Sequence, residues 1–144
     1  MTTQSIDALV VQKVRTVLAA VADVSKYVGS RIYVSHISTI RDAVFPACSI
    51  HILSGSTDID GPFGETTDLQ IDFWFAVGKD QATWDNVMEC VEAAIVALNR
   101  AGLWDNSLGI KIFESRCLQK GPQMVERDGA LIHYPTRWTF RAAL

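Results

Sequence analysis

The chain has 144 residues, a net charge of −3, 49% apolar residues and 20% charged residues. The length suits a single domain over residues 1–144, and the composition is that of a globular protein and not of a disordered one. The acidic balance argues against a dedicated nucleic-acid-binding protein, which usually carries a basic face. No apolar run approaches the roughly 20 residues of a membrane span.

The first residues lack the basic start and apolar block of a secretion signal. We therefore expect the three cysteines to be free thiols in a reducing cytoplasm.

Residues 5–21 have the three- and four-residue apolar spacing of an amphipathic helix, which Ser5 can cap. Its predicted inner face consists of Ile6, Leu9, Val10, Val14, Val17, Leu18 and Val21. Residues 22–30 break the pattern, and Gly29 is a plausible helix stop. A short strand is expected over 31–35, followed by a loop to residue 44.

Two strands are predicted at 47–53 and 67–77, around a turn-rich segment at 54–66. In the first, Cys48, Ile50 and Ile52 point one way and Ser49, His51 and Leu53 the other. In the second, the core face contains Leu69, Ile71, Phe73, Phe75 and Val77.

A second helix of about 20 residues is predicted from Asp80 to the stop at Gly102. Its expected inner face contains Trp84, Val87, Met88, Val91, Ile95 and Leu98. A strand follows at 109–117, then a Gly-Pro break and an Asp-Gly turn signal.

The last 15 residues alternate as a strand, with Ile132, Tyr134, Trp138, Phe140 and Ala142 on one face. Pro135 suggests that part of this strand lies at a sheet edge or carries a bulge. The adjacent strand pairs predict an α+β fold: a mainly antiparallel β-sheet with two amphipathic helices packed on one face.

No pattern predicts a metal, a cofactor or a catalytic site. Cys48 and His51 are three residues apart on a strand, so they point to opposite faces and do not ligate one ion. Cys90 and Cys117 lack the spacing of a zinc or redox site. A cysteine nucleophile beside a distant histidine remains open, although no local nucleophile signature is present.

The acidic groups also have structural interpretations. Asp58, Asp60 and Glu65 lie in a segment too short for a helix-loop-helix calcium site, so a solvated hairpin loop is expected. Asp68 and Asp72 are interpreted as solubility or edge-protecting charges on the polar face of a strand.

Three apolar or aromatic residues lie on the face opposite the predicted core: Trp74, Leu131 and His133. They are covered either by loops of the same chain or by a neighbouring subunit, since aromatic residues are enriched at interfaces. Phe63 is flanked by Pro62 and Gly64, where it is poorly placed to reach the core. We therefore predict that the loop contacts a partner, with Phe63 as an anchor and Asp58, Asp60 and Glu65 as steering charges. The alternative is a mobile loop without a partner.

The order of these segments resembles the tail-terminator (tail-completion) proteins of tailed bacteriophages, including the branch found in gene transfer agents. After the N-terminal helix come "VGSRIYVSHI", a loop, "FPACSIHI" and a hairpin loop with acidic residues. The alternating strand "TDLQIDFWFAV", the helix "WDNVMECVEAAIVAL" and "ERDGALIHYPTRWTFRAAL" follow. The proline of "YPTRW" departs from the family pattern and leaves the pairing of the last strand in doubt.

The resemblance implies a homohexameric ring that caps the tail tube, ends its growth and contacts the head-completion protein at the head-proximal end of the tail, after assembly in the host cytoplasm. It implies no catalytic residue, no cofactor and no membrane. DNA would pass through the lumen, where six copies carry about −18 charges (6 × −3). The alternatives are another neck or tail subunit, such as a head-completion or tail-tube protein, or a small cytoplasmic α+β enzyme.

Overall fold

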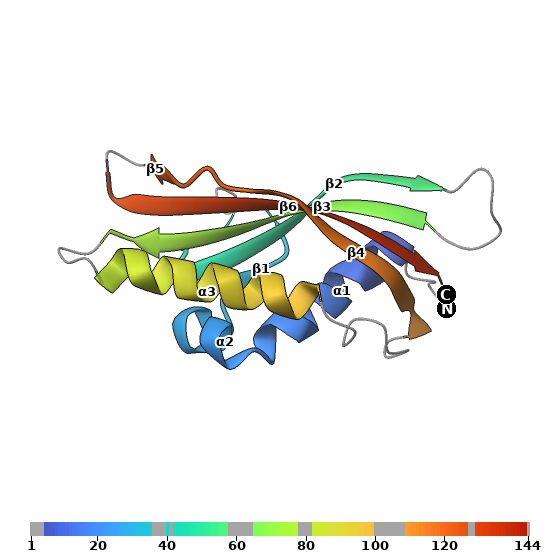
Figure 1. The fold of residues 1–144 in the computed structure, drawn as a ribbon, viewed down its shortest axis with the longest axis horizontal. Coiled ribbons are helices and arrows are strands. Elements are labelled where there is room, and N and C mark those ends of the chain that lie inside the picture. Colours follow the sequence, from blue (N-terminus) through green and yellow to red (C-terminus); the bar gives the residue numbers. More distant parts are fainter. Residues whose placement is uncertain are drawn as a thin grey trace.

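A six-stranded sheet forms the frame of the protein (Figure 1) in the computed structural model, which describes residues 5–35, 40, 42–57, 65–77, 82–99, 109–126 and 129–143. The strands are β1 (Ile32–Tyr33), β2 (Ala47–Thr57), β3 (Glu65–Ala76), β4 (Lys111–Lys120), β5 (Met124–Glu126) and β6 (Leu131–Ala143). Their order is β1-β2-β3-β6-β4, and β5 also pairs with β6. Only the short β1–β2 pair is parallel, so the predicted α+β class with a mainly antiparallel sheet is confirmed.

In the described part of the chain, three helices lie on one face of the sheet: α1 (Ile6–Ala19), α2 (Ala22–Val28) and α3 (Ala82–Leu98). The Ser5 hydroxyl caps α1 as predicted, because it accepts a hydrogen bond from the Ala8 amide at 3.1 Å. The prediction of two helices missed α2. This helix has only 7 residues, and its buried face consists of Val24 and Val28, four positions apart. Gly29 ends it at a φ of 55°, a conformation that glycine adopts at little cost.

The main core lies between the helices and the sheet. The predicted core residues Leu69, Ile71, Phe73, Phe75, Leu98 and Trp138 are all at most 3% exposed, and Ile95 packs against them half-buried. Antiparallel pairing aligns the alternating residues of β3 and β6, so that Leu69 faces Trp138 and Phe73 faces Tyr134. This register directs both apolar stripes toward the helices.

The β2–β3 hairpin is longer than predicted. Thr57 pairs with Glu65, so 54–57 and 65–66 belong to strands and not to a loop of residues 54–66. Backbone hydrogen bonds extend a hairpin even where it has no apolar stripe. The polar residues at these strand ends therefore showed no strand pattern in the sequence. Asp58, Asp60 and Phe63 lie outside the described residues, as do Asp80 and Gly102.

Pro135 lies within β6, a strand that is paired on both sides. It faces Asp72 of β3, and on the other side β4 ends at Lys120 and β5 begins at Met124. The Pro135 carbonyl accepts a hydrogen bond from the Gly121 amide at 2.8 Å. Since N and C=O of one strand residue point to the same side, the missing N–H of Pro135 faces the break between β4 and β5. The short strand β5 was not predicted from the sequence.

Candidate functional site

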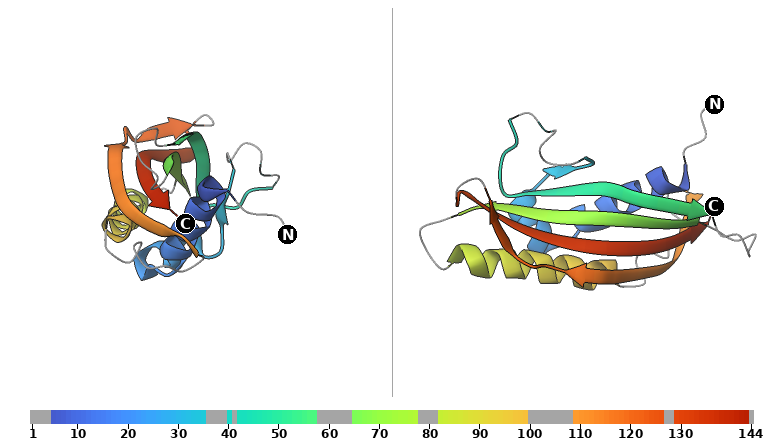
Figure 2. Two further views of the ribbon diagram at one scale, coloured as in Figure 1. Left: turned by 90° about the vertical axis from the view of Figure 1, so that its right-hand side faces the viewer. Right: turned by 90° about the horizontal axis from the view of Figure 1, so that it is seen from above.

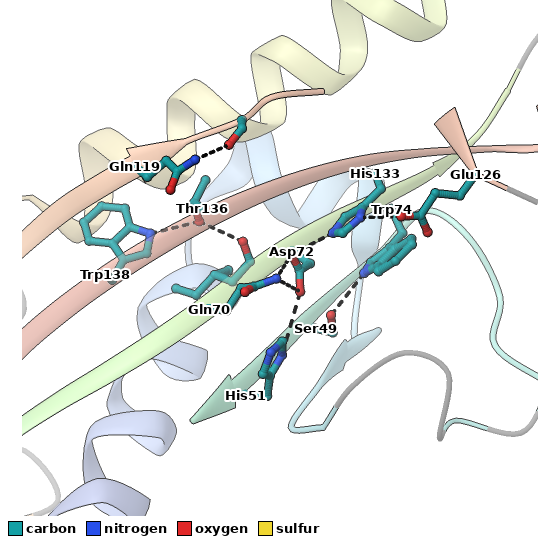
Figure 3. Close-up of polar contacts among 12 residues, drawn as sticks. Ser49, His51, Gln70, Asp72, Trp74, Gln119, Glu126, His133, Thr136 and Trp138 are labelled. Atoms are coloured by element: carbon teal, nitrogen blue, oxygen red, sulfur yellow. Dashed lines mark hydrogen bonds and ion pairs between the residues drawn. The ribbon is translucent and has the colours of Figure 1, made fainter. Parts of the chain in front are cut away.

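A buried polar network crosses the sheet on the face opposite the helices (Figure 3). Asp72 of β3, His133 of β6 and Glu126 of β5 form its centre. The Nε2 atom of His133 lies 2.7 Å from Oδ1 of Asp72, and its Nδ1 atom lies 3.0 Å from Oε1 of Glu126. The side-chain amide of Gln70 donates to both carboxylate oxygens of Asp72, at 2.9 and 3.2 Å. The network therefore links three strands through one imidazole ring.

Burial gives the network its electrostatic character. Asp72 is 0% exposed and His133 is 6% exposed. Burial by itself lowers the pKa of His133, but the hydrogen bonds from its ring to Asp72 and Glu126 outweigh that effect and raise the pKa above its usual value. A protonated ring donates to both carboxylates at once, whereas a neutral ring donates to only one.

Trp74 lies beside the network, against His133. Its indole ring stacks on the His133 ring, with centroids 3.9 Å apart and planes 6° from parallel. The indole Nε1 atom donates to the Ser49 hydroxyl at 3.0 Å. Trp74 also forms a second apolar cluster with Ala47 and Leu131, onto which Tyr33, Ile40, Ala43 and Phe45 pack.

Around the network, the described residues do not form an activated nucleophile. Both His133 nitrogens face carboxylates, and Ser49 is fully buried and bound to Trp74. Burial raises the pKa of Cys48 well above its usual value and that of Cys90 to about 12, so neither thiol is a thiolate near neutral pH. Within the described residues, no cluster of three His, Cys, Asp or Glu side chains is arranged to hold a metal ion.

The pair Cys48 and His51 behaves as the strand alternation predicted. Cys48 is buried in the main core, while His51 lies on the opposite face with its Nδ1 atom 3.7 Å from Oδ2 of Asp72. His51 thus belongs to the periphery of the polar network and not to a site with Cys48.

The residues predicted at an interface differ in their surroundings. Trp74, Leu131 and His133 are 3%, 4% and 6% exposed in the single chain, so the same chain covers them, one of the two alternatives left open. Their contact with a neighbouring subunit stays a prediction, and little of their surface remains exposed for such a contact. Glu65 starts β3 and is half-buried between Thr57 and Ala142. It is therefore a strand residue and not a loop residue.

The interpretation of Asp72 as a solubility charge was wrong. Asp72 is fully buried at the centre of the network, and its partner His133, which also contacts Glu126, lies 61 residues further along the chain. From the sequence alone, a carboxylate on the back face of an alternating strand is interpreted as solvated, because the sequence does not reveal the elements that cover it. Asp68 matches its predicted role better, since it is half-buried and accepts from the Ser54 hydroxyl at 2.9 Å.

Two of the hollows on the outer surface are lined in part by exposed apolar side chains. A groove of about 650 Å³ between α2 and α3 is lined by Val21, Asp23, Glu89, Glu92, Ala93, Val96 and Ala97. A second pocket of about 310 Å³ beside the β2 edge is lined by Ala8, Val11, Gln12, Arg15, Val34 and Ile52. No helix in the described part of the chain has the length and apolarity to cross a bilayer.

No protein-family model and no curated protein matches the chain. In contrast, its fold is similar to that of a chain in the solved virion of a native gene transfer agent particle, with a TM-score of 0.61. The two chains are 15% identical, and the match covers 97% of this chain and 96% of the other. At this identity, the comparison demonstrates a shared fold along almost the whole length of both chains.

Proposed function

We propose that this protein is a structural component of a phage-type virion, with no enzymatic activity. The observation that carries the proposal is the nearly end-to-end match to a chain of a gene transfer agent virion. Both chains are almost fully covered, so the similarity extends beyond a shared subdomain. The polar network agrees with a structural role, because every ring nitrogen of His133 is used to join strands.

Within the virion, we assign the protein to the tail-terminator role. Six copies would form a ring at the head-proximal end of the tail tube, end tube growth and provide the tail side of the head–tail junction. The order of sequence motifs supports this role, and the tail-tube and head-completion proteins would be its partners. DNA would cross the lumen without specific binding, which agrees with the net charge of −3 per copy.

Another neck or tail subunit is the second candidate, since the match is to a virion chain of unspecified position. A head-completion protein or a tail-tube protein would fit the same observation. The cytoplasmic enzyme receives less support, because the cluster most similar to a catalytic site has no free histidine nitrogen and no thiolate beside it.

Deletion of the gene in a particle-producing strain separates these roles by electron microscopy. Loss of a terminator gives headless tails of uncontrolled length. Loss of a tube subunit gives heads without tails, and loss of a head-completion protein gives tails of normal length that do not join heads. Complementation with the wild-type gene is the control. Intact, infective or DNA-transferring particles after deletion would overturn the proposal.

A further inference from the structure

Some of the exposed apolar side chains lie on two opposite flanks of the molecule. Val34 and Ile52, 50% and 46% exposed, lie beside the pocket of α1 and β2, which we name the α1–β2 flank. Met88, which was predicted on the inner face of its helix, is 38% exposed; together with Val96, 45% exposed, it defines the α3 flank. Figure 2 shows β2 and α3 on opposite sides of the protein in both views.

The α1–β2 flank includes an unprotected sheet edge. In the described part of the chain, β1 pairs with β2 only at Cys48 and Ser49, so the remainder of that β2 edge lacks a strand partner. No charged residue and no proline occurs in β2 from Ala47 to Thr57. Sheet edges exposed to solvent are usually protected by charges, bulges or a covering element.

The opposite edge strand, β4, carries such protection. Its exposed residues include Lys111, Arg116 and Lys120, and two register irregularities interrupt its pairing with β6. β2 has one such irregularity, between Ile52 and Ser54, but no Lys, Arg, Asp or Glu side chain, so it is the less protected of the two edges. Arg15, an exposed cation, lines the pocket beside that edge.

The α3 flank has the complementary properties. Met88, Glu92 and Val96 occupy positions i, i+4 and i+8, so they form one exposed stripe along the helix. The helix contains three acidic residues, Asp85, Glu89 and Glu92, and no lysine or arginine. The Glu92 carboxylate lies 3.7 Å from the Lys120 ammonium group. Both side chains are more than half exposed, so this ion pair is weak.

We propose that the α3 flank of one copy docks onto the α1–β2 flank of the next copy. This contact rests on the proposed function, because it is the head-to-tail interface that a closed ring requires. Apolar side chains of α3 enter the 310 Å³ pocket, the helix covers the bare β2 edge, and Glu92 approaches Arg15. A two-fold contact between two α3 flanks is disfavoured, since it would bring the exposed Glu92 carboxylates of the two copies together.

Cysteine cross-linking tests the contact. In a Cys117→Ser background, purified protein carrying both Val34→Cys and Val96→Cys is treated at high concentration with a short bis-maleimide. Cys48 and Cys90 stay unreactive because they are buried. We expect a ladder of covalent multimers. A mixture of the two single variants gives one dimer and no ladder, and each single variant alone stays monomeric.

The matched control replaces Val96→Cys with Val125→Cys, a similarly exposed site on β5. Absence of the ladder, equal cross-linking of the control pair, or dimers from a single variant would overturn the contact. The same variants are cross-linked in purified particles. If deletion shows the terminator phenotype but particles give no ladder, the proposed contact fails alone. If the ladder forms but deletion leaves particles intact, the proposed function fails alone.

Discussion

Replacing His133 tests whether the polar network stabilises the sheet as a charged unit. The His133→Gln substitution leaves Asp72, which is 0% exposed, without its imidazole partner. Removing one member of a buried charged pair costs about 3–5 kcal/mol in the free energy of unfolding. Because the glutamine amide can still donate one hydrogen bond, we expect a loss near the lower end, about 3 kcal/mol.

The loss depends on pH in a defined direction. Since the pKa of His133 is raised in the folded protein, its stabilisation is fully present below the unfolded pKa and disappears as pH rises through the folded pKa. The difference between wild type and His133→Gln is therefore larger at about pH 6 than at about pH 9. Urea unfolding followed by circular dichroism measures both values.

Glu126→Gln provides the control. The Glu126 side chain is 40% exposed and contacts the other ring nitrogen, so its replacement costs less, about 1 kcal/mol or below. Equal losses for His133→Gln at both pH values would show that the ring is not charged between the two carboxylates. A loss below about 1 kcal/mol would show that the network does not stabilise the sheet.

Three further predictions follow from the fold. Phe73→Ala, at a residue 1% exposed in the core, should lower the free energy of unfolding by about 3–5 kcal/mol in urea titrations, and an unchanged midpoint would contradict the register of β3. A thiol reagent at neutral pH should label Cys117 and leave Cys48 and Cys90 unmodified until the protein is denatured, since burial raises the pKa of both core thiols. Rapid labelling of Cys48 or Cys90 in the folded protein would contradict their burial. Replacing residues 58–64, which include Phe63, by Asn-Gly should preserve the melting curve, because Thr57 already pairs with Glu65, but should block head joining or length control; tails of normal length that still join heads would remove the loop from the interface.

The local sequence pattern was sufficient to predict most of the helices and strands. The alternation of β3 and β6 identified the buried face, because side chains in a strand alternate strictly between the two faces. The capping of α1 by Ser5 was also predictable, since it depends on residues within one turn. The short helix α2 was missed because 7 residues are too few to display a helical period.

The candidate site depended on contacts that no local pattern contains. Asp72, Glu126 and His133 come from three strands, and only the order β3-β6-β5 places them around one ring. The same holds for Trp74, whose exposure depended on whether other parts of the chain cover it, as Tyr33, Ile40, Ala43 and Phe45 do. Sequence periodicity determines which face a side chain points to, whereas tertiary structure determines what covers that face, and the covering decides whether a carboxylate is solvated or buried in an ion pair.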